Sequence, residues 1–169
     1  MILAVDTYYF DQKAKTACIA FEQWTDNVPF KIYTEILENV ADYTSGEFYK
    51  RELPCILSIL KQVEFDTIEA IVVDGFVYLD NAQKPGLGAY LYKALESKVP
   101  VIGVAKTNFA TVEKDKQLLL RGNSKSPLYI TAVDMDIHVA AQHIKNMHGE
   151  YRMPTLLKQV DTLTKTKNA

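Results

Sequence analysis

The sequence predicts an α/β protein built on one mixed sheet, in which an antiparallel meander is followed by parallel strands, with helices on both faces. Up to residue 38, three runs rich in β-branched and aromatic residues are separated by short polar or proline-containing links, which is typical of a meander. Beyond residue 67, continuous apolar runs alternate with helical patterns, which indicates parallel strands covered on both sides. A chain of 169 residues can bury a sizeable core, and we expect one domain over residues 1–169.

The first half of the chain supplies the meander and one helix. Residues 1–6, 15–23 and 30–38 are the three expected strands, and Tyr43–Gly46 is an expected turn. Between residues 47 and 63 apolar side chains recur at spacings of three and four, which predicts a helix. Pro54 lies inside that pattern, so we expect the helix to start or kink near it.

The second half alternates strands and helices. The expected strands lie at 68–73, at 99–107 and in a hairpin over 117–131, and the expected helices at 87–96, 137–147 and 155–163. Three antiparallel strands followed by strand–helix units match the order of a ribonuclease H-like fold. In such open sheets, ligands bind beyond the carboxyl ends of the central parallel strands.

Composition narrows the class of protein. The net charge of −2 argues against binding nucleic acid by charge alone, although a local basic patch or a bound metal remains compatible with it. No stretch approaches the roughly 20 apolar residues of a membrane span, and the start MILAVDTYYF lacks the features of a signal peptide. Two cysteines form no metal-type spacing. We expect a cytoplasmic, monomeric protein with no membrane association.

Two aspartates end apolar runs that should be neighbouring strands. MILAVD stops on Asp6, and Ala70–Val73 runs directly into Asp74. If the two strands are adjacent, the carboxylates project from the same edge and repel each other, unless a divalent cation lies between them. Mg²⁺ suits such a place, because it binds one or two carboxylates together with water and phosphate oxygens. The alternative is a plain turn, since Asp-Gly is a strong turn dipeptide.

Further acids could complete such a site. Glu52 lies in the predicted helix and could equally be a solvated surface charge partnered by Lys50 or Arg51. Asp134 and Asp136 precede an apolar helix, where capping is the commoner role of aspartate. From the residues alone, either interpretation is open for each of these acids.

The order of short motifs resembles the endonuclease V family, nucleases that act next to inosine, which is deaminated adenine. The motifs run through most of the chain, and the most specific is IGVAK, residues 102–106. They are Val5-Asp6, Tyr43-Thr44-Ser45-Gly46 with Arg51-Glu52-Leu53-Pro54, Val73-Asp74-Gly75, Pro100 through Lys106, Pro127-Leu128-Tyr129-Ile130-Thr131 and Tyr151-Arg152-Met153-Pro154.

The resemblance implies a metal-dependent endonuclease that hydrolyses a phosphodiester bond 3′ to inosine in DNA or RNA, in a single-stranded or locally unpaired region. Asp6, Glu52 and Asp74 would be metal ligands, and Lys106 would stand near the scissile phosphate. Asp134 would take the family's fourth acid position, with Asp136 as the alternative. The cofactor would be Mg²⁺, for which Mn²⁺ can substitute, and the metal would activate water and neutralise charge in the transition state.

The departures from the family concern substrate recognition. The resemblance implies that Tyr43, Gly46 and Gly75 contact nucleic acid, with Tyr43 as the wedge that separates the two strands. In the family this tyrosine is flanked by prolines, whereas Asp42 and Ser45 stand in their places here. The loop after Gly75 lacks the family's glycine, histidines and arginine. A metal-dependent nuclease with another nucleic-acid substrate, or a non-catalytic nucleic-acid-binding relative, are therefore the alternatives.

Overall fold

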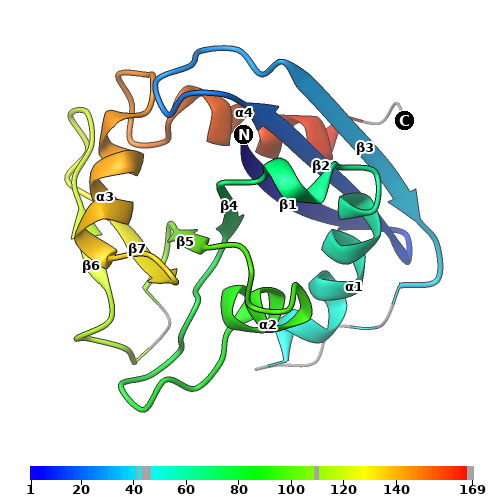
Figure 1. Ribbon diagram of the computed structural model, residues 1–169, viewed down its shortest axis with the longest axis horizontal. Helices are drawn as coiled ribbons and strands as arrows, with labels where there is room; N and C mark the ends of the chain where they lie inside the picture. Colours follow the sequence, from blue (N-terminus) through cyan, green and yellow to red (C-terminus); the bar gives the residue numbers. More distant parts are fainter. Residues whose placement is uncertain (41, 43–46, 109–110, 167–169) are drawn as a thin grey trace.

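The computed structural model describes residues 1–40, 42, 47–108 and 111–166 of the chain. Within these residues, seven strands form a single mixed sheet in the order β3-β2-β1-β4-β5-β7-β6 (Figure 1). The strands are β1 Ile2–Phe10, β2 Lys13–Phe21, β3 Lys31–Leu37, β4 Ala70–Asp74, β5 Val101–Ala105, β6 Gln117–Leu119 and β7 Leu128–Val133. The predicted fold class is confirmed: an antiparallel meander, β1 to β3, is joined to the parallel strands β1, β4 and β5.

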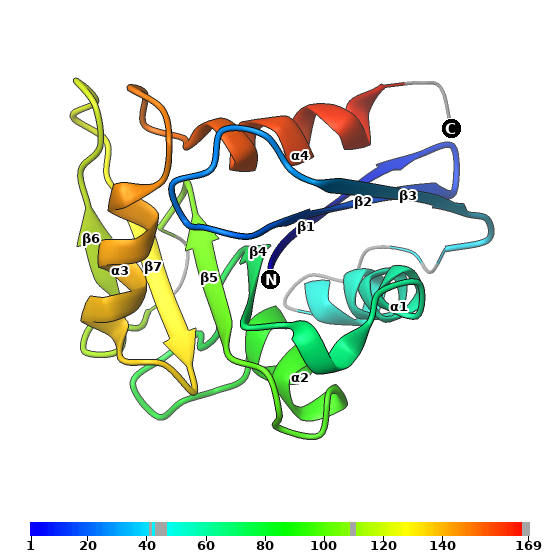
Figure 2. The same ribbon diagram turned by 45° about the horizontal axis from the view of Figure 1, so that its top comes forward.

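Helices cover both faces of this sheet. They are α1 Phe48–Leu60, α2 Leu87–Ala94, α3 Ile137–Asn146 and α4 Thr155–Lys165, with a short 3-10 turn at Phe65–Thr67. Figure 2 shows α1 and α2 on one face and α3 and α4 on the other. Along β1 the side chains alternate between the two cores, so that Ala4 packs with the α3–α4 side and Val5 with the α1–α2 side.

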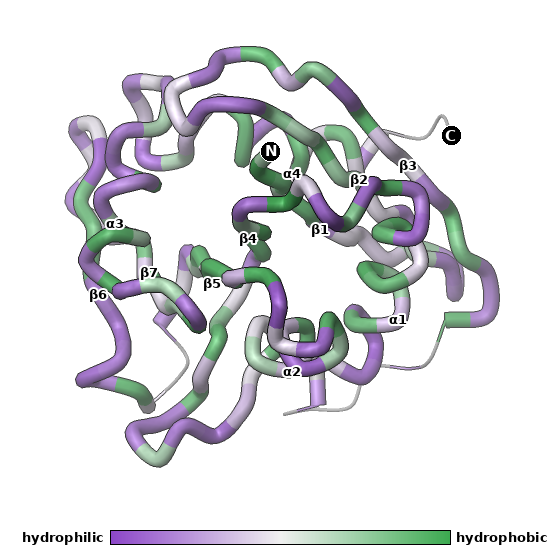
Figure 3. The backbone as a smooth tube through the Cα atoms, in the orientation of Figure 1, coloured by the Kyte–Doolittle hydropathy of each residue, from purple (hydrophilic) through white to green (hydrophobic). Residues whose placement is uncertain are grey.

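The central strands carry the apolar runs that predicted them. In β4 every residue before Asp74 is buried, and all of β5 is buried. Figure 3 shows hydrophobic residues along β4 and β5 in the middle of the molecule. Because β1, β4 and β5 are parallel, their carboxyl ends meet at one edge of the sheet.

The β1–β2 hairpin is longer than the sequence patterns predicted. The strand expected at 1–6 continues to Phe10, and pairing with β2 runs to Phe10 opposite Lys13. Asp11 and Gln12 join the strands with φ of 47° and 61°, the conformation of a two-residue hairpin turn. Parallel pairing with β4 stops at Val5, so residues 6–10 extend beyond the central sheet.

Helix α1 differs from the prediction at Pro54. The helix begins at Phe48 and continues through Pro54, which therefore does not mark its start. A proline removes one helical hydrogen bond, but Ile56 and Ile59 are fully buried against the sheet. Packing of this apolar face holds the helix together across the proline. None of the described helices is long and apolar enough to cross a membrane.

Candidate functional site

Asp6 lies where the parallel pairing of β1 with β4 stops, and Asp74 is the last residue of β4, so both lie at the same edge of the parallel part of the sheet. Val5 of β1 pairs with Val73 of β4 in parallel register, which places the two aspartates side by side. Asp6 is only 8% exposed, and its Oδ1 accepts a hydrogen bond of 2.9 Å from the backbone N–H of Thr7. Asp74 lies at the exposed mouth of the site. The interpretation that the two carboxylates meet is thus supported by the register.

Glu52 approaches this edge from α1, on the opposite side from α4. It is 2% exposed, and its Oε2 has no hydrogen-bond partner within the described part of the chain. The neighbouring Arg51 stacks on the ring of Tyr9, with its guanidinium carbon 3.6 Å from the ring centroid. A buried carboxylate oxygen without a donor is costly, so a bound cation would stabilise Glu52 in its ionised form.

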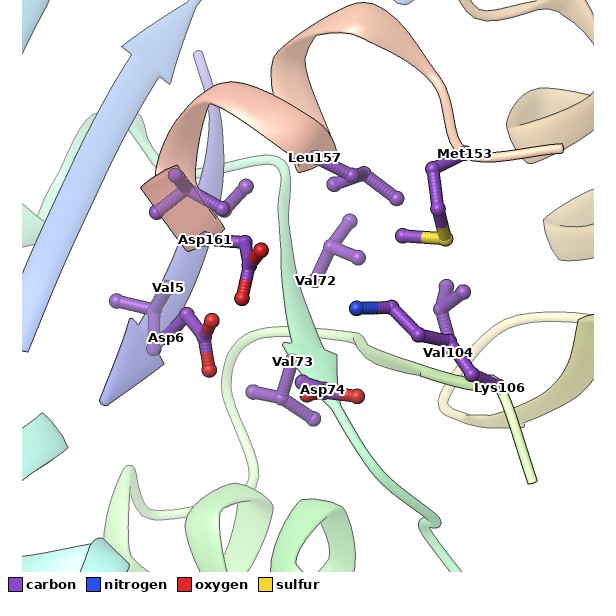
Figure 4. A pocket seen from close by; sticks show the side chains of 12 residues that line it. Val5, Asp6, Val72, Val73, Asp74, Val104, Lys106, Met153, Leu157 and Asp161 are labelled. Atoms are coloured by element: carbon purple, nitrogen blue, oxygen red, sulfur yellow. The ribbon is translucent and has the colours of Figure 1, made fainter. Parts of the chain in front are cut away.

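A fourth carboxylate, Asp161, comes from α4. Together with Asp6, Asp74 and Lys106 it lines a pocket whose floor is made of apolar side chains from β1, β4 and α4. Figure 4 shows the amino group of Lys106 pointing toward Asp6, Asp74 and Asp161. Asp161 forms an ion pair of 3.0 Å with Lys165, one turn later in α4.

Burial and mutual repulsion weaken the acidity of the carboxyl groups at the strand ends. Burial, followed by the charge of Asp74, raises the pKa of Asp6 to about 7. Burial, followed by Asp6 and Asp74, raises the pKa of Glu52 well above its usual value. Burial also raises the pKa of Asp74, although the charge of Lys106 opposes this shift. At Asp161 burial is the largest influence and acts in the same direction, but the hydrogen bond from Lys165 together with the charges of Lys106, Lys165 and Lys158 outweighs it and lowers the pKa.

The prediction that Asp134 completes the acid cluster does not agree with the geometry. β7 runs antiparallel to β5, and its last residue, Val133, pairs with Val101 at the start of β5. Asp134 therefore lies at the edge of the sheet opposite Asp6, where it is exposed. Asp136, the alternative, caps α3: its Oδ1 accepts hydrogen bonds from the N–H groups of His138 and Val139. Capping was the other interpretation of these acids.

Sequence reasoning missed Asp161. One signal was available: Leu157, Val160 and Asp161 fall at positions i, i+3 and i+4, so they share one face of α4. Leu157 and Val160 are buried, and that face packs on β1 and β2. A carboxylate on the buried face of a helix is unusual enough to indicate a site.

Two glycines permit the backbone conformation that follows Asp74 at the end of β4. Gly75 has a φ of +132°, a conformation that side chains disfavour, and open space surrounds the position where its Cβ would be. Gly103 in β5 lies under the same loop, where a Cβ would clash with the Gly75 carbonyl. The predicted contact of Gly75 with nucleic acid stays a prediction, and Tyr43 and Gly46 lie outside the described residues.

The donors at this edge fit a hard divalent cation. Within the described ranges, no three His, Cys, Asp or Glu side chains are placed close enough to hold a metal ion together. Mg²⁺ does not require three, because it takes one or two direct carboxylates and fills its remaining positions with water and phosphate oxygens. The residues fit such a cation, because it would partner the Oε2 of Glu52 and offset the repulsion and burial that raise the pKa of Asp6.

The comparison with family models decides the family. The model of endonuclease V matches residues 1–162. The chain belongs to the endonuclease V family. An endonuclease V is a nuclease, and with this result the resemblance carried by the short motifs is confirmed.

Solved endonuclease V structures share this fold. Human ENDOV has a TM-score of 0.76 at 19% identity, with 97% of this chain and 82% of that chain covered. Endonuclease V of Bacillus subtilis gives 0.76 at 18%, covering 96% and 78%. The Ciona intestinalis enzyme, solved with a 24mer DNA containing an inosine followed by a ribo-adenosine, gives 0.77 at 16%, covering 97% and 84%. The search of curated proteins found no match.

Proposed function

We propose that this endonuclease V family member hydrolyses the phosphodiester bond 3′ to inosine in unpaired DNA or RNA, with Mg²⁺ or Mn²⁺ as cofactor. The observation that carries the proposal is the meeting of Asp6, Asp74 and Asp161 with Lys106 in one pocket at the carboxyl edge of the sheet. A similar structure, that of the Ciona enzyme, contains an inosine in its DNA.

The carboxylates would hold the metal. Asp6 and Asp74 are the direct ligands that the strand register favours, and Glu52 and Asp161 would bind or orient the surrounding water from the two faces of the sheet. The bound metal supplies an activated water and offsets negative charge on the phosphate. Without a cation, burial and charge repulsion raise the pKa of Asp6 to about 7 and raise the pKa of Glu52 as well, so metal binding competes with protonation.

Lys106 would stabilise the charge that develops on the phosphate. Its side chain is exposed at the pocket and acts electrostatically on both Asp6 and Asp74. The guanidinium of Arg152 donates to the Lys106 carbonyl at 2.6 Å and to the Pro127 carbonyl at 2.7 Å. This clamp fixes the backbone from which Lys106 reaches the substrate, and a fixed cation lowers the barrier more than a mobile one.

One observation favours a second candidate, a nuclease of the same fold with a different substrate. The loop after Gly75 turns its first side chains inward: Phe76 and Val77 are almost fully buried. Asp80 closes the rest of the loop by accepting hydrogen bonds from the N–H groups of Ala82 and Lys84. A loop packed in this way presents different groups to a base than one rich in glycine and histidine.

The test is cleavage of end-labelled single-stranded DNA and RNA, each with and without one inosine, first in Mg²⁺ and then in Mn²⁺. We expect one cut 3′ to inosine. Asp74→Asn should abolish it, while Asp134→Asn, the same change at the opposite edge of the sheet, should leave it intact.

Three outcomes separate the candidates. Equal cutting of adenine and inosine strands would reject the inosine preference and support the second candidate. If the protein binds Mg²⁺ but cuts no strand in either metal, the proposal that it cleaves next to inosine is rejected. Absence of both cutting and Mg²⁺ binding would indicate the non-catalytic alternative.

A further inference from the structure

The outer half of the β1–β2 hairpin presents aromatic side chains next to the carboxylate pocket. Asp6, Tyr8 and Phe10 alternate onto the same face of β1, because successive strand residues point to opposite sides. Tyr8 is 44% exposed and Phe10 is 36% exposed, whereas Ile2 and Ala4 on this face are fully buried. Figure 2 shows the hairpin extending past the end of β4. The exposed rings thus begin where the pocket ends.

The two rings are arranged as a short stack. Their centroids are 6.5 Å apart, and their planes differ by only 20°. This spacing is close to twice the rise of about 3.4 Å per nucleotide along one strand of a stacked nucleic acid, so neighbouring bases reach both rings when the strand is stretched out of its helical stack. Aromatic rings held parallel at a strand surface are the feature on which unpaired bases stack, with little dependence on sequence.

Positive charge borders the rings. Lys13 pairs across the hairpin with Phe10, and its side chain is 42% exposed. The side chain of Lys165 is 52% exposed and interacts electrostatically with Tyr8 and Asp6. Each of these lysines also contacts an acid, Glu38 at 3.2 Å and Asp161 at 3.0 Å. Lysines at this edge complement a phosphate backbone that continues from the pocket along the hairpin.

We propose that Tyr8 and Phe10 form a platform on which two bases of a single-stranded substrate stack as the strand leaves the carboxylate pocket. The platform's place in catalysis rests on the proposed nuclease function, but its binding to single strands does not. It makes the enzyme favour unpaired strands, because bases in a duplex are already stacked and do not offer their faces. Tyr8 and Phe10 bind substrate and take no part in the chemical step.

Binding is measured by fluorescence anisotropy with a labelled single-stranded thymidine oligonucleotide in Ca²⁺. We expect Tyr8→Leu and Phe10→Leu each to weaken binding about tenfold. Tyr8→Phe and Phe10→Tyr, which keep the rings, should bind as the wild type does. Phe30→Leu is the matched control, since Phe30 is 54% exposed and its N–H binds Ala20 at the other end of β2.

A second measurement removes the bases instead of the rings. Abasic positions placed one at a time along the oligonucleotide should weaken wild-type binding at two neighbouring positions. They should have no effect there on the Tyr8→Leu, Phe10→Leu double variant. Unchanged affinity of the leucine variants, or equal sensitivity of wild type and double variant to abasic positions, would overturn the platform.

The outcomes keep the platform and the proposed function apart. Ring-dependent binding without inosine cleavage would retain the platform and reject the proposed function. Inosine cleavage with unchanged KM in both leucine variants would retain the function and reject the platform. If both hold, KM for single strands rises about tenfold in the leucine variants while kcat stays the same.

Discussion

Asp6 and Asp74 leave adjacent parallel strands at the same level of the sheet, because Val5 of β1 pairs with Val73 of β4. Each aspartate alone could be a turn residue, but this pairing brings them close enough for the charge of one to affect the ionisation of the other. Burial and the charge of its neighbour raise the pKa of Asp6 to about 7, far from that of a solvated aspartate. The consequences for metal binding, activity and stability can be measured.

The first prediction concerns metal affinity. We expect Asp74→Asn to weaken Mg²⁺ binding about tenfold or more, because removing a residue that supports a metal site typically lowers the affinity for the metal by at least this factor. Isothermal titration of the wild type, Asp74→Asn and Asp134→Asn tests this. Asp134→Asn should match the wild type, because Asp134 follows Val133 at the opposite edge. Identical Mg²⁺ affinities in all three proteins would exclude this edge as the metal site.

The second prediction concerns Asp161. Asp161→Asn removes the carboxylate that α4 contributes to the pocket, so we expect nuclease activity to fall by roughly two orders of magnitude. The variant also frees Lys165 from its 3.0 Å ion pair. Lys165→Met, which breaks the same pair but keeps the carboxylate, separates the two effects. If Lys165→Met loses as much activity as Asp161→Asn, the ion pair and not the carboxylate is what matters.

The third prediction concerns pH. In the metal-free protein the pKa of Asp6 rises from an ordinary 3.8 to about 7, so between these values the folded state holds a proton that the unfolded state has lost. Its contribution to the free energy of unfolding is therefore greatest at low pH and declines as pH rises from about 4 to 7. Thermal melting in EDTA should show Asp6→Asn gaining stability over the wild type across this window. A difference that does not change with pH would contradict the raised pKa.

The wild type and Asp6→Asn should also differ in how much Mg²⁺ stabilises them. Mg²⁺ binds the ionised carboxylates of the folded state, so it should raise the melting temperature of the wild type more at pH 7 than at pH 5. Asp6→Asn should respond weakly at both. A larger rise at pH 5 would mean that the cation binds elsewhere.

The fourth prediction concerns Lys106. Removing a cation directed at the developing phosphate charge costs on the order of 100-fold in kcat. We expect Lys106→Met to show this loss with nearly unchanged Mg²⁺ affinity. Lys98→Met is the control, since Lys98 is exposed just before β5 starts and pairs with Glu96. A loss confined to KM would assign Lys106 to substrate binding alone.

The fifth prediction concerns Arg121, which holds the segment leading into α4. It is 5% exposed and donates to several backbone carbonyls, including those of Met147 at 2.7 Å and Gly149 at 3.1 Å. Arg121→Leu leaves these buried acceptors unpaired, which should cost about 3 kcal/mol or more. Chemical denaturation measures this loss, with the exposed Lys125→Leu as control. A loss below about 1 kcal/mol would mean that water replaces the guanidinium.

Much of the fold could be predicted from local pattern. Continuous apolar runs located β4 and β5 because strands buried on both faces need apolar side chains at every position. The end of β1 was harder to predict: the strand was expected to stop at Asp6, and only its pairing with β2 carries it on to Phe10. The helix around Pro54 was predicted, but its start was not, because packing outweighs the local cost of the proline and the helix begins before it, at Phe48.

The sequence by itself determined the two carboxylates Asp6 and Asp74, since each is the first charged residue after an apolar run. It also determined the family, through motifs whose order survives great divergence. Only the tertiary structure decided that Asp161 belongs to the pocket and Asp134 does not. The physical reason is strand direction: β7 runs antiparallel to β5, which carries its last residue away from the site, while α4 crosses β1 and brings Asp161 over Asp6.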